Sequence, residues 1–380
     1  MKKAVCISIF NHYDNRVLFA EKFLAGKGYD VTYIASDFDH YIKDKYKIER
    51  ENVLQVRGRP YYKNISVQRL YSHHDSANEC YRILEEIKPD LIYTLVPPNS
   101  QSRVVAKYKK KHKDTIVLMD LFDLWPETFP SLKKNPLLRA AFYCWRSVRD
   151  AGLNMADYII TECGLYRMVL ENQLSDKKSK ILHLCKTDYG RRRVLHIDTS
   201  PLNICYLGSI NNIIDIETIM ALLRAMAKHR PLVLHVIGGG ENTKALLDFD
   251  EQNDNIKTEY YGILYDEAKK HEIMDKCAFA INILKKSVCI GLTMKSVDYF
   301  EAGVPIINNV TSDTSWIIDK YGAGINIDDN IEKCAAKIMA MDKKKLITMR
   351  YSTRKAYEEM FSEKVYYERF EEIFEELELD

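Results

Sequence analysis

Three features that often reveal a protein's class are missing from this sequence: paired cysteines, long apolar runs and an excess of charge of one sign. The nine cysteines include no CxxC pair, which argues against a zinc site or a thioredoxin-like motif and favours buried, reduced thiols of a cytoplasmic protein. No stretch approaches the roughly 18 apolar residues of a membrane-spanning helix. With 56 basic and 54 acidic residues the net charge is only +2, so we expect no nucleic-acid partner.

Glycine is also scarce where a dinucleotide site would need it. Neither half of the chain carries GxGxxG after its first expected strand, which counts against a dinucleotide-dependent oxidoreductase. The loop 11–16, which follows the first strand, contains no glycine at all. The apolar run 4–10 before it has no cleavage-site pattern, so we interpret it as a strand and not as a secretory signal.

The sequence does contain an alternation of strand-like apolar runs with helical segments. In the first half the expected strands are 4–10, 31–35, 91–96, 115–119 and 158–161. After a polar, basic interval at 187–200 the alternation restarts, and the expected strands are 203–207, 232–237, 258–261, 278–283 and 305–307. Such alternation predicts parallel α/β sheets, and the restart predicts two Rossmann-like domains, 1–195 and 196–364.

Two segments of the second domain end a strand in glycine. Tyr206-Leu207-Gly208-Ser209 places free backbone N–H groups before a helix, where the helix dipole favours an anion; an ordinary β–α turn is the alternative. The three glycines 238–240 follow the next strand and could lie against a ligand, although tight turns also use glycine.

The segment Gly291–Pro305 (GLTMKSVDYFEAGVP) carries the strongest signal. Lys295 falls in the first turn of a helix, where the dipole disfavours a cation, so a bound phosphate would explain it. Asp298 and Glu301 lie three apart on one helix face and could bind sugar or ribose hydroxyls. Alternatively, these carboxylates are solvent-facing charges on a surface helix.

The order of these segments resembles the C-terminal domain of GT-B-fold glycosyltransferases, particularly the retaining family-four type of bacterial capsule and cell-surface polysaccharide synthesis. Those proteins carry a donor-site segment G-x-P-x-K-x-x-E-Y-x-x-x-G-x-P. This chain has Gly291, Thr293 in the proline place, Lys295, Asp298 for the glutamate, Tyr299, Gly303 and Pro305. The resemblance covers the second domain well and the first more loosely.

The resemblance implies two Rossmann-like domains facing across a cleft, with the final helix, 365–380, packing back on the first. It implies diphosphate binding by Gly208, Ser209 and Lys295, and ribose contact by Asp298. The donor-binding residues expected on this basis are Gly208, Ser209, Gly238, Gly239, Tyr261, Thr293, Met294, Lys295, Ser296 and Asp298.

One position of the donor segment departs from the family. Many members have two glutamates with seven residues between them, and the earlier glutamate contacts the sugar. The later one maps to Asp298, and the earlier to Ile290, which has no polar group. The sugar contacts must therefore differ here, or transfer is impaired.

In the first domain the segment 120–127 (DLFDLWPE) follows a strand and resembles the D-x-W-P-E element of bacterial polysaccharide transferases. Acidic groups at the carboxyl end of a strand line the crevice where α/β domains bind ligands. Asp123 could orient or deprotonate an acceptor hydroxyl. The alternative is a capped turn with a tryptophan as packing anchor. The acceptor-side residues expected are Asn15, Asn99, Asp123 and Glu127.

Basic and aromatic residues gather in the same domain. Lysines cluster at 107–113, and the helix expected at 137–156 mixes Arg139, Arg146 and Arg149 with an aromatic face. A helix of this kind can lie on an anionic membrane, and lipid-linked acceptors are common in the family. The alternative is a core-facing helix with a solvated basic side.

The leading hypothesis is a retaining, metal-independent glycosyltransferase with Asp123 and Lys295 as catalytic residues. It would move a sugar from a nucleotide-sugar, expected to be a UDP-sugar, to a saccharide or lipid-linked saccharide. A DxD triplet at 37–39 lies in the first domain, away from the donor segment, so we expect neither a metal nor another cofactor. Two alternatives are a non-catalytic, transferase-like partner subunit and a nucleotide-sugar epimerase, for which no convincing acid–base pair can be placed.

Overall fold

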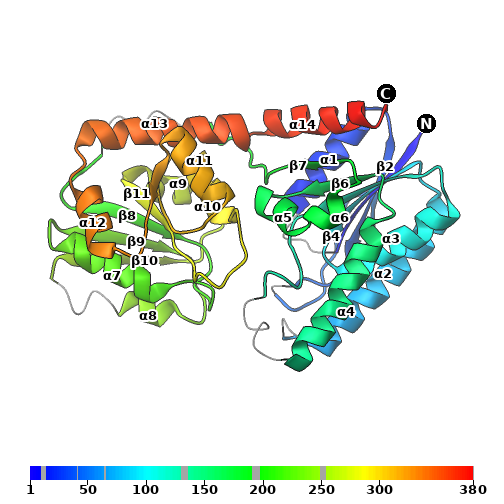
Figure 1. The fold of residues 1–380 in the computed structure, drawn as a ribbon, viewed down its shortest axis with the longest axis horizontal. Coiled ribbons are helices and arrows are strands. Elements are labelled where there is room, and N and C mark those ends of the chain that lie inside the picture. Colours follow the sequence, from blue (N-terminus) through cyan, green and yellow to red (C-terminus); the bar gives the residue numbers. More distant parts are fainter. Residues whose placement is uncertain are drawn as a thin grey trace. The chain divides into compact units, whose positions relative to one another are not determined.

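The structure is a computed structural model that describes residues 1–9, 14–40, 42–63, 66–129, 136–190, 197–248 and 254–379. It divides into two compact units (Figure 1). The first unit consists of Met1–Cys185 together with Tyr366–Asp380, and the second of Lys186–Val365. The division after Cys185 lies ten residues before the boundary expected at 195/196.

The first unit is built on a seven-stranded parallel sheet in the order β3-β2-β1-β4-β5-β6-β7. Its strands are β1 (Lys3–Ser8), β2 (Asp30–Ser36), β3 (Val53–Val56), β4 (Leu91–Val96), β5 (Ile116–Leu121), β6 (Tyr158–Thr161) and β7 (Ser179–Ile181). All six residues of the central strand β4 are buried, as expected for a strand covered on both faces. The edge strands β3 and β7 escaped the sequence analysis because they are short and partly exposed, and so lack a continuous apolar run.

The helices of this unit are α1 (Asp14–Gly26), α2 (Val67–Ile87), α3 (Asn99–Lys111), α4 (Pro136–Leu153), α5 (Gly164–Val169), α6 (Glu171–Leu174) and α14 (Glu363–Glu376). Helix α2 begins at Val67, because Ser66 caps it by accepting a hydrogen bond from the backbone N–H of Arg69 at 3.2 Å. No helix among the described residues is long and apolar enough to cross a membrane.

Helix α14 completes the core of the first unit, as predicted. Its Phe370 and Phe374 lie 4.8 and 5.0 Å from the ring of Phe23 on α1, and both are fully buried. The hydroxyl of Tyr366 also donates to the backbone carbonyl of Arg16 at 3.2 Å. The last helix of the chain is therefore part of the first domain's core.

A buried ion pair holds the carboxyl end of this sheet together. The Arg16 guanidinium donates to both oxygens of Asp120, at 2.7 and 2.9 Å, and Asp120 is fully buried. Arg16 also donates to the carbonyls of Leu182 and His183, which follow β7. Asp120 is thus committed to a structural pair rather than to a ligand.

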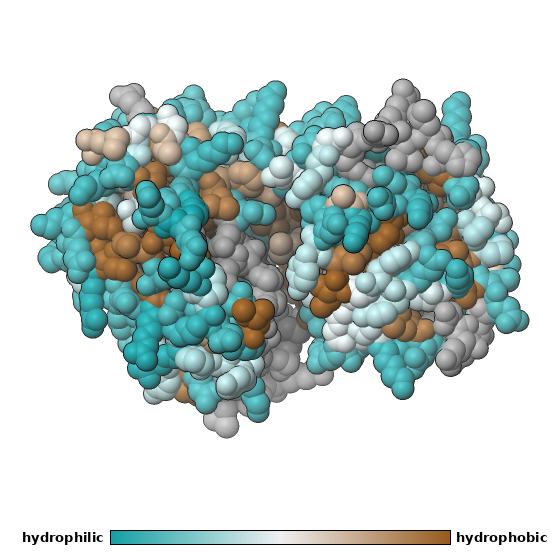
Figure 2. Space-filling view, turned by 180° about the vertical axis from the view of Figure 1, so that it is seen from behind, coloured by the Kyte–Doolittle hydropathy of each residue, from teal (hydrophilic) through white to brown (hydrophobic). Residues whose placement is uncertain are grey.

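The second unit contains a six-stranded parallel sheet in the order β10-β9-β8-β11-β12-β13. Its strands are β8 (Leu202–Leu207), β9 (Leu232–Ile237), β10 (Ile256–Gly262), β11 (Phe279–Asn282), β12 (Ile306–Asn308) and β13 (Gly324–Asn326). Its helices are α7 (Ile216–Ala227), α8 (Thr243–Leu247), α9 (Glu267–Lys276), α10 (Met294–Glu301), α11 (Asp313–Tyr321), α12 (Ile331–Met339) and α13 (Lys343–Met360). The face shown in Figure 2 is mostly hydrophilic on each unit, with separate apolar patches.

Three asparagines connect the last strands of this sheet. The Asn282 amide donates to Asn308 at 2.9 Å, and the Asn308 amide donates to Asn326 at 2.8 Å. Thr293, the N-cap of α10, donates to Asn282 at 3.1 Å. This chain of side-chain hydrogen bonds ties the start of α10 to the carboxyl end of the sheet, where α/β domains bind ligands.

Candidate functional site

Two glycine loops meet at the carboxyl ends of β8 and β9. A Cβ on Gly238 would lie 2.0 Å from the carbonyl oxygen of Gly208, and a Cβ on Gly240 would lie 2.5 Å from that of Ile210. The backbone of Ile210 donates to the carbonyl of Gly239 at 3.0 Å. Close packing of the two loops therefore explains Gly238 and Gly240 without a ligand.

Gly208 differs from these glycines because the space beside it is open. Its φ is +112°, which favours glycine, and no atom lies within 4 Å of the position that a Cβ would take. Ser209 next to it is exposed, and its carbonyl accepts from the Tyr206 hydroxyl at 2.8 Å. The backbone N–H of Ser209 has no partner among the described residues. A ligand can therefore approach the end of β8 closely.

The N-terminus of α10 is held by a reciprocal capping box. The Thr293 hydroxyl accepts from the Ser296 N–H at 3.1 Å, and the Ser296 hydroxyl accepts from the Thr293 N–H at 3.2 Å. Both hydroxyls, which were predicted to bind the donor, thus serve the helix end. The N–H groups of Met294 and Lys295 stay without a partner in the described part of the chain, as anion binding would require.

Lys295 is the most unusual group in this region. Its ammonium nitrogen is buried and makes no hydrogen bond to any described residue, and it lies 4.9 Å from the ring centroid of Tyr206. Burial lowers its pKa from 10.5 to about 7. Because Tyr206 also bonds Ser209, one aromatic side chain brings together the lysine and the end of β8. A buried cation without a counter-ion can bind an anion such as a phosphate.

Asp298, predicted to contact a ribose, is paired in this structure. Lys186 contacts its carboxylate and also lies 3.2 Å from Glu267, and these two carboxylates raise the pKa of Lys186 although burial opposes them. No local sequence pattern indicates Lys186, because it lies 112 positions before Asp298. Glu301, the other carboxylate of the helix, is fully buried, with His271 at 2.7 Å and Arg354 at 3.4 Å, so it is a core group.

Two tyrosines near the site have different roles. The Tyr299 hydroxyl accepts from the N–H of Leu207 at 2.7 Å and donates to the carbonyl of Ile281 at 3.3 Å, so it fixes α10 against the ends of β8 and β11. The Tyr261 hydroxyl bonds His235 at 2.9 Å and donates to Glu259 at 2.7 Å, so it is engaged within the second unit. Within the described part of the chain, no hydrogen bond or ion pair joins Tyr261 to the other predicted donor residues.

Ile290 borders a hollow of the second unit. It packs partly on the core and lines a cavity of about 570 Å³ together with Leu284, Ile327 and Ile331. The polar rim of the cavity includes Asp215, Lys285 and Asp329. Ile290 aligns with the glutamate that contacts the sugar in the resembled family, and here it contributes an apolar side chain to the cavity wall.

Three of the four predicted acceptor-side residues surround Trp125. Asp123 accepts from the Trp125 indole N–H at 2.6 Å, and burial raises the pKa of this carboxyl. The Asn99 amide donates to the carbonyls of Trp125 and Trp145 at 3.2 and 3.0 Å. Glu127 accepts from Arg149 at 2.8 and 3.0 Å. Asn15, the fourth, is exposed on α1 and makes no contact with these groups.

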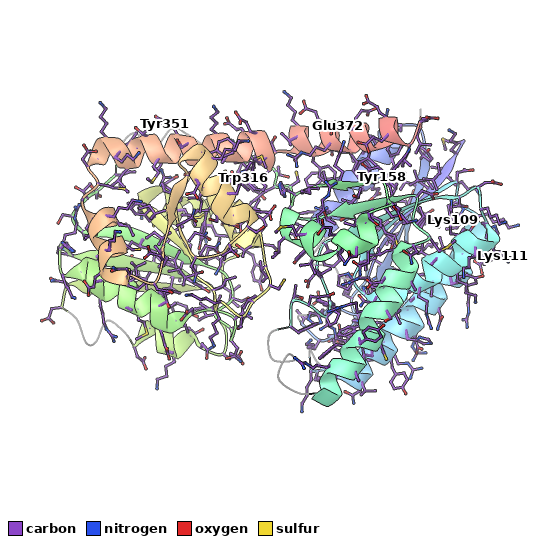
Figure 3. All side chains as sticks on the ribbon, viewed as in Figure 1. Lys109, Lys111, Tyr158, Trp316, Tyr351 and Glu372 are labelled. Carbon is purple, nitrogen blue, oxygen red and sulfur yellow. The ribbon has the colours of Figure 1, made fainter. Side chains whose placement is uncertain are left out.

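The basic–aromatic surface is largely occupied by internal contacts. Lys109 lies 2.8 Å from Asp157 and Lys111 lies 2.5 Å from Glu85; Figure 3 labels both lysines at the end of α3. Trp145 of α4 packs 5.9 Å from Phe129, although Tyr143 is exposed. The side chains of 137 and 138, and residues 133 and 134, lie outside the described residues.

Comparison with known proteins gives a fold but no close relative. No protein-family model matches the chain, and no curated protein matches it. Over 99% of both chains it is similar to sucrose-phosphate synthase from Thermosynechococcus elongatus, with a TM-score of 0.74 and 14% identity. It is similar over 99% of its length to all of the galactosyltransferase WaaB of the lipopolysaccharide outer core, with a TM-score of 0.66 and 11% identity. The same coverage holds for Anabaena HepE in complex with UDP and glucose, with a TM-score of 0.64 and 10% identity. The chain thus has the two-domain α/β fold of GT-B glycosyltransferases.

Proposed function

We propose that this protein transfers a sugar from a nucleoside-diphosphate sugar and that the diphosphate binds beside Lys295. The observation that carries the proposal is the buried ammonium of Lys295, which has no partner among the described residues. It lies over Tyr206, whose hydroxyl bonds the carbonyl of Ser209 beside the open Gly208, and it belongs to the first turn of α10, where N–H groups are free. The HepE structure, a neighbour in fold, is described as a complex with UDP and glucose.

In the proposed reaction, the bond between the sugar's anomeric carbon and the diphosphate oxygen breaks, and a bond to an acceptor hydroxyl forms on the same face. The acceptor's proton passes to a phosphate oxygen. Lys295 and the N–H groups of Met294 and Ser209 would stabilise the charge on the leaving diphosphate, so no metal is needed. Asp298 would bind the ribose after exchanging part of its contact with Lys186 for the ribose hydroxyls.

The acceptor side of the proposal centres on Trp125. Both oxygens of Asp123 accept hydrogen bonds, from Leu124 and from Trp125, so we assign Asp123 the role of orienting the indole beside the acceptor. The acceptor would be a saccharide or a lipid-linked saccharide of surface polysaccharide synthesis. For a lipid-linked acceptor we expect α4, with exposed Tyr143, to contact an anionic membrane, which vesicle flotation would test.

The central test is UDP binding by calorimetry, followed by transfer from radiolabelled UDP-sugars to a membrane lipid extract. Lys295→Met should lose at least tenfold in UDP affinity, since a charge-assisted bond to phosphate disappears. Lys286→Met is the matched control, because Lys286 is exposed and pairs with Asp329 at 2.5 Å. Equal UDP affinity of both variants and the wild type would contradict the assignment.

One observation favours a second function, a transferase-like partner subunit without activity. Ile290 forms an apolar wall where the family has a sugar-contacting glutamate, and Asp298 is already paired with Lys186. A protein with no affinity for UDP, GDP, CMP or ADP, which co-purifies with an active glycosyltransferase, would support this alternative.

A further inference from the structure

The second unit begins with a short segment, 186–190, that contacts three of its helices, and we call this segment the entry strap. It forms no helix or strand of its own. Lys186, its first residue, contacts the carboxylate of Asp298 on α10 and lies 3.2 Å from that of Glu267 on α9. One ammonium group therefore serves two carboxylates from two helices, and one of them is the proposed ribose contact.

The backbone of Lys186 is fixed at both of its polar groups. Its N–H donates to the carbonyl of Phe361 at 3.0 Å, and its carbonyl accepts from the Tyr357 hydroxyl at 2.7 Å. Two residues further on, Asp188 pairs with Arg354 of α13. Because the backbone is anchored, the ammonium group can pivot between the two neighbouring carboxylates but cannot move far from either.

The two carboxylates differ in the other cations that support them. Glu267 also pairs with Lys270, three residues further along α9. Asp298 has no second cationic partner in the described part of the chain. Both side chains are partly exposed, at 25% for Glu267 and 27% for Asp298, so a ligand can reach them. Movement of Lys186 onto Glu267 would therefore leave Asp298 as a free acceptor.

The contact with Lys186 uses an oxygen that a ribose would need. The ammonium group contacts Oδ1 of Asp298, whereas two neighbouring ribose hydroxyls can donate to both oxygens of one carboxylate. Burial lowers the pKa of Lys186, but the charges of Asp298 and Glu267 outweigh burial and raise it, so the group stays charged at neutral pH. The free protein thus holds Asp298 in an ion pair that a nucleotide must weaken.

We infer that Lys186 competes with the donor's ribose for Asp298 and so sets the affinity of the site for ligands that carry both ribose hydroxyls. In the free protein the ammonium group holds Asp298. When a nucleoside diphosphate binds, the ammonium group shifts to Glu267 and the two hydroxyls donate to Asp298. Lys186 is a positioning residue, because it acts through Asp298. The inference rests on the proposed function for the ribose contact itself.

The test is calorimetric titration of the full chain with UDP, with 2′,3′-dideoxy-UDP and with pyrophosphate. Lys186→Met frees Asp298, so the affinity for UDP relative to pyrophosphate should rise about three- to tenfold, with no such gain for dideoxy-UDP. Glu267→Gln removes the carboxylate that receives Lys186, so the same ratio should fall by a similar factor. A purely structural anchor would lower UDP affinity in both variants.

Three further variants serve as controls. Lys269→Met should leave the ratio unchanged, because Lys269 is exposed on the same helix as Glu267 and lies 4.0 Å from Asp266. Lys186→Arg keeps the charge and should bind UDP no more tightly than the wild type does. In an Asp298→Asn background, Lys186→Met should add nothing to the affinity for UDP.

The outcomes separate this inference from the proposed function. A wild-type protein that binds no UDP would refute the proposed function. UDP binding that is lost in Lys295→Met, together with an unchanged or lower UDP-to-pyrophosphate ratio in Lys186→Met, would refute the competition alone. If Lys186→Met fails to fold, Glu267→Gln decides, and a ratio equal to or above that of the wild type would overturn the inference.

Discussion

Replacing Lys295 with methionine should stabilise the free protein while weakening UDP binding at least tenfold. Burial lowers the pKa of Lys295 from 10.5 to about 7, so the folded state resists protonation that the unfolded state accepts. One tenfold change in a protonation constant corresponds to about 1.36 kcal/mol, which gives an upper bound of ~5 kcal/mol below pH 7. Movement of the side chain toward water reduces this cost, so we expect a gain of about 2–5 kcal/mol at pH 6.

The sign of the pH dependence follows from the same shift. Between pH 7 and pH 10.5 the unfolded chain holds a proton that the folded chain has lost, so wild-type stability rises with pH relative to Lys295→Met. Below pH 7 the full penalty is present. Calorimetric melting at pH 6 and pH 9 measures this difference. At pH 6 we expect the transition that responds to UDP in the wild type to lie roughly 5–15 °C higher in the variant.

UDP binding should raise the pKa of Lys295 again. A phosphate beside Lys295 restores the charged form, so UDP binding at pH 8 should take up about 0.9 proton, the fraction missing from a group with a pKa near 7. Titrations in Tris and in HEPES would show this as a difference in apparent enthalpy. A variant no more stable than the wild type at pH 6, together with equal enthalpies in the two buffers, would refute the reasoning. Lys286→Met should change neither quantity.

Three further predictions concern the other described contacts. Arg16→Met leaves the buried Asp120 without its positive partner, with only the Tyr93 hydroxyl still donating to it, and should cost about 3–5 kcal/mol of stability in urea unfolding; a loss below about 1 kcal/mol would contradict the burial argument. Gly238→Ala places a Cβ 2.0 Å from the Gly208 carbonyl and should cost more than about 3 kcal/mol, whereas Gly28→Ala, with open space around it, should cost less. Asp298→Asn should weaken UDP binding roughly tenfold but leave pyrophosphate binding unchanged, and an equal loss for both ligands would exclude a ribose contact.

The alternation of apolar runs and helices was sufficient to predict both sheets. Apolar runs such as 91–96 and 232–237 are strands with those same bounds, because a strand buried on both faces needs a continuous apolar segment. The same rule fails for β3, β7 and β13, which have only three or four residues each and stay partly exposed. Local pattern therefore predicts the centre of a sheet better than its edges.

The candidate site also has a part that local sequence predicts and a part that depends on tertiary packing. A lysine in the first turn of α10 is visible in the sequence, because a cation opposes the helix dipole there, and this local conflict indicated Lys295. The pairing of Lys186 with Asp298 and the approach of Arg69 to Trp125 join residues 112 and 56 positions apart. No periodicity encodes such pairs, because they depend on how the strands and helices pack. The sequence by itself determined the α/β class and the position of Lys295, and only the tertiary structure decided which carboxylates are already paired and which cation lies against Trp125.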